Sequence, residues 1–115
     1  GIRHKERNIM KRLAALIVSA LVLVSGSAFA EDHIVTQGGK KFSPAVLNIS
    51  AGDTVTFVND DKSRHNIYSK TDGVNIKIKK QKPGDRDTVT IDHVGSIDIR
   101  CAIHPKMKMV INVTE

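Results

Sequence analysis

Apolar and polar residues alternate in short runs throughout the chain after residue 30. Successive side chains of a strand point to opposite faces, so apolar residues two positions apart share one face. No stretch after residue 30 has the apolar spacing of a helix. The pattern therefore predicts strands that each bury one face. The paired apolar positions are Leu47 and Ile49, Val55 and Phe57, Ile76 and Ile78, Val89 and Ile91, Ile97 and Ile99, and Ile111 and Val113.

Turn signals separate these runs and set the expected number of strands at seven or eight. Glycine and proline punctuate the chain at Gly38-Gly39, Pro83-Gly84 and Gly95. Many short strands with turns between them are typical of an antiparallel sandwich or barrel. The expected strands cover residues 46–49, 54–59, 65–68, 75–79, 88–92, 96–101 and 109–113, with a weaker one at 33–36.

The first 30 residues have a different pattern. A basic segment precedes an apolar run at 13–24, and small residues follow it up to Ala30. This order is typical of a secretory signal peptide with cleavage after Ala30, and the run is shorter than the roughly 20 residues of a spanning helix. We expect translation to start at Met10, so that residues 1–9 lie upstream. Residues 31–115 then form one exported domain that has no membrane segment.

Charge says little about the partner beyond excluding nucleic acid. The chain has 18 Lys and Arg against 12 Asp and Glu, but five of the basic and one of the acidic residues lie in the first 30. The domain thus carries 13 basic and 11 acidic residues. It has no dense basic stripe and only three aromatic residues, Phe42, Phe57 and Tyr68. Such a composition does not favour a nucleic-acid-binding surface.

Soft metal ligands gather near the end of the chain, in Cys101-Ala102-Ile103-His104-Pro105-Lys106-Met107-Lys108-Met109. A thiolate, an imidazole and a thioether suit a trigonal His₂Cys copper site with a weak axial Met. The second histidine must come from elsewhere, and His65 is the candidate. Cys101 is the only cysteine, so it has no partner for a disulfide within the chain. In an oxidising compartment, burial or metal binding would protect this thiol.

Cys101 continues the inward face of Ile97 and Ile99, which places its thiol at the inner end of a strand. A copper ligand would lie there, and so would a structural core cysteine. Met109 shares the parity of the last strand, which favours a core residue.

The longer motif resembles the small bacterial cupredoxins, closest to amicyanin-like proteins associated with methylamine utilisation. It runs Phe42-x-Pro44-x-x-Leu47-x-Ile49-x-x-Gly52-Asp53-Thr54-Val55-Thr56-Phe57-x-Asn59, then His65-Asn66, then Gly95-x-Ile97-x-Ile99-x-Cys101-x-x-His104-Pro105-x-Met107. The resemblance covers most of residues 42–113. It implies a Greek-key β-sandwich that holds one type 1 copper ion. One departure is that Ile97 and Ile99 stand where the family has an aromatic residue.

The resemblance also implies the site residues. His65, Cys101 and His104 would be the equatorial ligands and Met107 the axial one, while Met109 has the spacing of plastocyanin-like loops. The backbone N–H of Asn66 would donate to the Cys101 sulfur. His33 and His93 match no ligand position, and we expect them on the surface.

The function implied is that of a monomeric periplasmic protein that shuttles single electrons between protein partners, such as a dehydrogenase or a cytochrome. Lys62, Arg64, Lys106 and Lys108 would frame the copper end and favour an acidic partner. An enzyme is not expected, because no third group that would orient a Cys–His nucleophile is apparent. A copper storage or delivery protein with the same ligands is the main alternative. A metal-free adhesion module would leave the ligand set unexplained.

Overall fold

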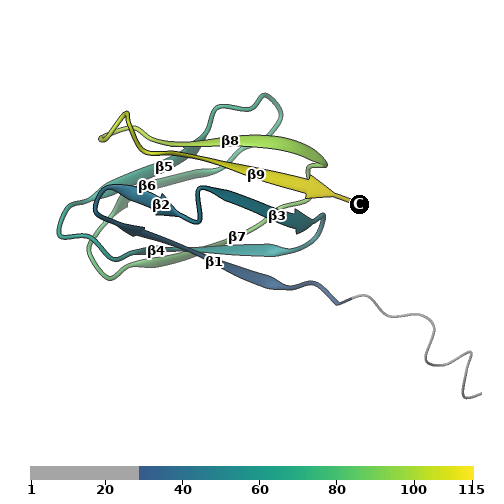
Figure 1. Cartoon of the computed structure of the whole chain (residues 1–115), viewed down its shortest axis with the longest axis horizontal. Helices are drawn as coiled ribbons and strands as arrows, with labels where there is room; N and C mark the ends of the chain where they lie inside the picture. Colours follow the sequence, from purple (N-terminus) through teal and green to yellow (C-terminus); the bar gives the residue numbers. More distant parts are fainter. Residues whose placement is uncertain (1–28) are drawn as a thin grey trace, which may run out of the picture.

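A computed structural model describes residues 29–115 as nine strands (Figure 1). The predicted leader, residues 1–30, lies almost wholly outside this range, so its cleavage stays a prediction. Within the described part, no helix is long and apolar enough to cross a membrane. The strands are β1 (Asp32–Gly38), β2 (Lys41–Ser43), β3 (Val46–Ser50), β4 (Thr54–Asn59), β5 (His65–Ser69), β6 (Lys77–Gln81), β7 (Arg86–Thr90), β8 (Gly95–Cys101) and β9 (Lys108–Thr114).

The strands form two sheets that pack face to face (Figure 1). One sheet has four strands in the order β2-β1-β4-β7, and the other has five in the order β3-β9-β8-β5-β6. Most neighbours are antiparallel, but β1 pairs with β4 and β3 pairs with β9 in parallel. These parallel pairs depart from the purely antiparallel expectation, because they join strands that are distant in sequence rather than adjacent hairpins. The predicted all-β sandwich is otherwise confirmed.

The core between the sheets consists of the inward faces that the alternation predicts. Val55, Phe57, Ile97, Ile99 and Ile111 are all fully buried. Phe42 meets Phe57 edge to face, with ring centroids 6.5 Å apart. The alternation in β8 continues to its last residue, where the Cys101 side chain is 1% exposed.

The structure differs from the expected strands at three places. The short strand β2 was not expected, because three residues are too few to display alternation. It is set by the tight turn at Gly39 and Lys40, which both have positive φ angles of 60° and 57°. Strands β6 and β7 lie about two residues from their expected positions. A bulge in the β5–β6 pairing brings buried Gln81 opposite His65, and a polar core residue gives no alternation signal.

The register brings four connections to one pole of the sandwich. Because β8 is antiparallel to both β5 and β9, the start of β5, the end of β8 and the start of β9 lie together. The parallel partners β1 and β4 both end there as well, and so does β6, while β7 starts there. The β1–β2 turn, the β4–β5 loop, the β6–β7 turn and the β8–β9 loop therefore form this pole, which we call the loop pole. The start of β1 and the end of β9 lie at the opposite pole (Figure 1).

Candidate metal centre

Cys101 lies at the inner end of β8, where the strand reaches the loop pole. Its side chain is buried, and the backbone N–H of Asn66 lies 3.4 Å from the sulfur, as expected from the sequence. The amide of Cys101 donates to the carbonyl of Met107 at 3.3 Å, which ties the strand end to the far side of the loop. The β8 ladder and this contact fix the direction of the thiol.

His65 is the first residue of β5 and is fully buried. Its Nε2 atom lies 2.8 Å from a carboxylate oxygen of Asp61. An ionised carboxylate can only accept, so this contact requires the proton to sit on Nε2. The Nδ1 atom then presents its lone pair toward Cys101, 3.7 Å away. The contact with Asp61 therefore selects the tautomer in which His65 can bind a metal.

His104 lies in the β8–β9 loop and is only partly buried. Its position is fixed by a tight turn in which the Met107 amide donates to the His104 carbonyl at 2.9 Å. Burial lowers the pKa of the His104 imidazole, and neighbouring His65 and Lys40 act in the same direction. A lowered pKa keeps the ring neutral, and only a neutral imidazole nitrogen can bind a metal.

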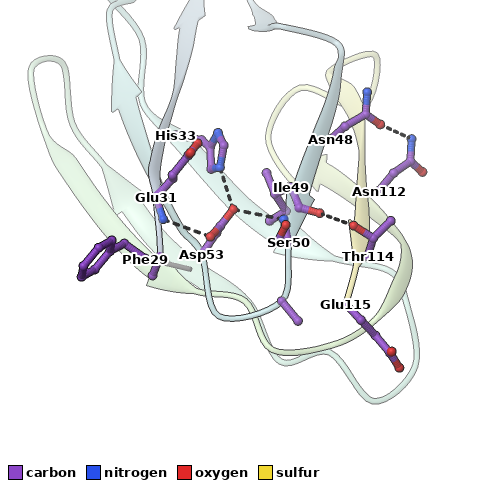
Figure 2. Close-up of a pocket in the computed structure, with 12 residues that line it drawn as sticks. Phe29, Glu31, His33, Asn48, Ile49, Ser50, Asp53, Asn112, Thr114 and Glu115 are labelled. Carbon is purple, nitrogen blue, oxygen red and sulfur yellow. Dashed lines mark hydrogen bonds and ion pairs between the residues drawn. The ribbon is translucent and has the colours of Figure 1, made fainter. Parts of the chain in front are cut away.

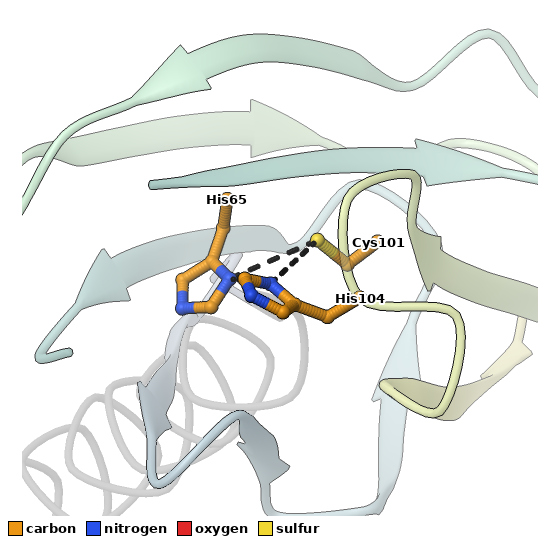
Figure 3. Close-up of side chains that lie close together, drawn as sticks. All are labelled: His65, Cys101 and His104. Carbon is orange, nitrogen blue, oxygen red and sulfur yellow. Dashed lines mark hydrogen bonds between the residues drawn. The ribbon is translucent and has the colours of Figure 1, made fainter. Parts of the chain in front are cut away.

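Three donor atoms meet at the loop pole, as Figure 3 shows. The two Nδ1 atoms of His65 and His104 lie 3.2 Å apart, and the sulfur of Cys101 lies 3.7 and 3.9 Å from them. With bonds of about 2.0 Å to nitrogen and 2.3 Å to sulfur, as for zinc, trigonal ligands would lie about 3.5 Å (N–N) and 3.7 Å (N–S) apart. The observed triangle matches these separations. The arrangement therefore fits one metal ion with two imidazoles and one thiolate.

The two methionines have similar burial but different positions. Met107 is 1% exposed and lies in the β8–β9 loop. Met109, two residues later, pairs with Ile99 in the β8–β9 ladder. Met109 is 2% exposed and packs in the sheet, as its parity predicts. Met107 belongs to the same turn as His104 and contacts Cys101 through its carbonyl. Met107 therefore lies in the same loop as His104, whereas Met109 lies in the sheet.

Asp61 is the site residue that the sequence reading missed. Its carboxylate accepts from the amides of Gly39 and Lys40 at 2.7 and 2.9 Å, besides its contact with His65. Burial would raise the pKa of Asp61, but the hydrogen bonds from the Lys40 amide and from His65 outweigh it, and the pKa is lowered. Asp61 thus joins the β1–β2 turn to His65. The available signal was a carboxylate four residues before His65, in a loop read as charged surface.

The surface beside His104 carries a different set of lysines from the expected one. A cavity there is lined by Lys40 and Lys41 of the β1–β2 turn, together with Ile103, Pro105 and Lys106 of the ligand loop. Ile103 is 47% exposed, so this surface includes an exposed apolar side chain. Lys106 is found as predicted.

Lys108, which was expected beside His104, lies opposite Arg100 in the β8–β9 ladder and lines a cavity on the sheet. Lys62 and Arg64 are exposed in the loop before His65. His93 is exposed as expected, whereas His33 is partly buried and contacts Asp53.

Comparison with known proteins agrees with this geometry. Residues 31–114 match the family model for copper binding proteins of the plastocyanin/azurin family. The chain belongs to this family. A protein named as a pseudoazurin in Rhizobium leguminosarum bv. viciae is 37% identical over 102 residues, which cover 80% of this chain and 65% of that relative. The match thus spans just under two thirds of that relative's length.

Three further proteins match over most of the chain. The methylamine utilization protein MauL of Methylorubrum extorquens is 26% identical over 108 residues, covering 93% of this chain and 95% of the relative. Among solved structures, a novel purple cupredoxin from Nitrosopumilus maritimus superposes with a TM-score of 0.65 at 25% identity, covering 72% of this chain and all of that one. An amicyanin structure at 23% identity, TM-score 0.66, covers 77% of this chain and 86% of its own and supports the fold. The cofactor is copper, and the donor set suits one copper ion.

Proposed function

We propose that this cupredoxin is a periplasmic carrier of single electrons. The observation that carries the proposal is the buried triangle of two imidazole nitrogens and one thiolate at the loop pole. Soft thiolate and imidazole donors in a trigonal arrangement are those of blue copper electron-transfer sites. The names of the relatives, a pseudoazurin and a methylamine utilisation protein, support the same role.

In this proposal His65, Cys101 and His104 are the equatorial ligands and Met107 is the axial ligand. A bound copper ion supplies one-electron redox chemistry between its cupric and cuprous states. The chain holds the donors in one arrangement for both states. Asp61 fixes the ring of His65, the Asn66 amide points at the Cys101 sulfur, and the turn to Met107 fixes His104. Because these contacts are set by the folded backbone, little reorganisation opposes transfer.

His104 is the residue through which electrons would enter and leave. It is the member of the triangle that is only partly buried, while His65 and Cys101 are buried. The apolar surface at Ile103 and Pro105 lets a partner approach closely, and transient redox complexes bury little area, below about 1,200 Å².

The lysines around His104 give the partner its chemistry. Lys40, Lys41 and Lys106 line the same cavity as Ile103 and Pro105. Their charges would attract an acidic protein, such as a dehydrogenase or a cytochrome, and raise its rate of association. The carrier acts as a monomer in this account. Its leader, cleaved after Ala30, would deliver it to the periplasm.

A copper storage or delivery protein is the second candidate, because it would use the same ligands. The buried positions of His65 and Cys101 favour a carrier, since a delivery site needs ligands that a recipient can reach. An enzymatic role is not proposed. The Cys101 sulfur is buried and faces two imidazoles, which is the arrangement of a metal ligand rather than of an accessible nucleophile.

Repeated redox cycling in the presence of a strong Cu(I) chelator tests the proposal. The copper-loaded protein is reduced and reoxidised several times, and its visible spectrum and copper content are measured after each cycle. A carrier keeps its copper and its spectrum throughout. Transfer of copper to the chelator on the first reduction would contradict electron transfer and support delivery.

A further inference from the structure

The amino-terminal end of strand β1 carries a second set of nitrogen donors, far from the loop pole. The sequence after Ala30 is Glu31-Asp32-His33. Cleavage after Ala30 would turn the nitrogen of Glu31 into a free α-amine with histidine as the third residue. Such a terminus offers four nitrogens in a row: the amine, two backbone amides that release their protons to water as the metal binds, and the imidazole Nδ1. Nitrogen donors in a square plane are the preference of Cu(II) and Ni(II).

The fold already brings the nitrogen of Glu31 and the imidazole ring of His33 to one carboxylate. In Figure 2 the backbone nitrogen of Glu31 and the ring of His33 both point at the carboxylate of Asp53. Glu31 donates to Oδ1 at 3.0 Å, and His33 Nε2 lies 2.9 Å from Oδ2. Asp53 is 6% exposed and is held further by the Ser50 amide at 3.0 Å. The Asp53 carboxylate is therefore in hydrogen-bond contact with both the nitrogen that would become the amine and the imidazole.

Ions and solvent can reach this end of the molecule. Phe29 and Ala30 line an open cavity there together with Glu31 and His33, so cleavage after Ala30 would uncover the new amine. The His33 side chain is 20% exposed. Its contact with Asp53 uses Nε2, which leaves Nδ1, the ring nitrogen nearer the main chain, for a chelate with the backbone.

The chelate must displace little of the fold. It releases the two contacts to Asp53 and the first two positions of the β1–β4 pairing, Asp32 with Thr54 and His33 with Val55. These positions form the exposed end of a strand, and strand ends open more readily than the core. The remaining pairs of β1 with β4 extend to Gln37 and stay in place.

We propose that processing after Ala30 creates a second metal site, in which the terminus Glu31-Asp32-His33 binds one Cu(II) or Ni(II) ion in a square plane of four nitrogens. Asp53 is not a ligand. It holds the amine and imidazole when no ion is bound. The site lies at the pole opposite Cys101 and would take up a divalent ion independently of the redox site. The inference rests on the cleavage that the proposed function includes, and not on electron transfer.

The experiment uses the exported, processed protein with its redox site filled by copper. Intact mass first establishes that the chain begins at Glu31. A different terminus would refute the cleavage alone, and the remaining steps would then test a protein prepared to begin at Glu31. Cu(II) is added as the only probe, and electron paramagnetic resonance is recorded. We expect one further equivalent with a tetragonal, nitrogen-rich signal, while the blue band stays unchanged.

Two changes should abolish this signal. One is His33→Ala, and the other is a single glycine added before Glu31, which moves the histidine to the fourth position and keeps every side chain. His93→Ala, at an exposed histidine elsewhere, is the matched control and should retain the signal. Asp53→Asn should also retain it, since Asp53 only competes for the donors. The blue band reports that each variant is folded.

Three outcomes would overturn the proposal. No second equivalent would mean that the terminus does not bind. A signal that survives the added glycine would mean a side-chain site that does not use the amine. Loss of the signal in Asp53→Asn, with the blue band intact, would make Asp53 a ligand and exclude the square plane of four nitrogens.

Discussion

The two buried methionines form a matched pair that tests the axial assignment. Met107 and Met109 are 1% and 2% exposed, so replacing either by leucine should cost the copper-free protein about the same, at most roughly 1.5 kcal/mol as a volume-conserving swap. For a domain of this size, 1 kcal/mol lowers the melting temperature by about 4–8 °C, so each loss should stay below about 12 °C. Stability alone will therefore not separate the two residues.

The reduction potential should separate them. An axial thioether donates to the metal and favours Cu(II), so Met107→Leu should raise the potential while the blue colour is kept. If loss of the thioether weakens the binding of Cu(II) relative to Cu(I) tenfold, the reduction potential rises by about 59 mV for a one-electron couple. Met109→Leu should leave the potential within a small fraction of this value. Protein-film voltammetry of both variants and thermal unfolding of their copper-free forms give the two readouts. A rise in Met109→Leu with Met107→Leu unchanged would refute the assignment.

Three further predictions follow from contacts around the sandwich. Asp61→Asn should raise the reduction potential in voltammetry, because the carboxylate no longer strengthens donation by the ligand imidazole; an unchanged potential would make Asp61 only a loop brace. Lys40→Glu with Lys106→Glu should slow electron transfer to an acidic partner in stopped flow at 0.1 M salt, where the Debye length is about 10 Å, and much less at 1 M, where it is about 3 Å. The pKa of Asp53 is lowered to about 2, chiefly by the amide of Glu31, so its stabilising contribution is present above the ordinary value of 3.8 and is lost as the pH falls through about 2. The urea concentration at the unfolding midpoint should accordingly fall less for Asp53→Asn than for the parent between pH 4 and 2. An equal fall in both proteins would contradict a stabilising contact at Asp53.

Much of the fold was readable because the core is apolar and each strand buries one face. The alternation of Ile97 and Ile99 led to Cys101 as an inward residue at a strand end, and the structure places it there. One strand that lies away from its expected position is β6, where buried Gln81 donates to the Phe57 carbonyl and to Asp87. A core position filled by an amide cannot be told from a surface position by hydropathy, because its burial depends on partners distant in sequence.

The candidate site also has residues that the sequence predicted and residues that it did not. Cys101 and His104 are close in sequence, so strand parity and ligand chemistry predicted that they lie together, and the structure places the Cys101 sulfur 3.9 Å from His104 Nδ1. Asp61 and Lys40 were missed because their roles depend on a contact between the β1–β2 turn and the β4–β5 loop, which are some 20 residues apart and are joined by a 2.9 Å hydrogen bond. Only the parallel pairing of β1 with β4 brings these segments together, and no local pattern encodes that pairing.

A Cu(II) titration of the protein, followed by visible absorption, shows whether the chain holds a blue copper site. We expect an intense blue band that saturates at one equivalent, because a Cu(II)–thiolate bond gives strong charge transfer. Cys101→Ser should abolish the band, and His65→Ala should abolish or greatly alter it. A protein that stays colourless with Cu(II) but binds Cu(I) would contradict the account and favour copper handling.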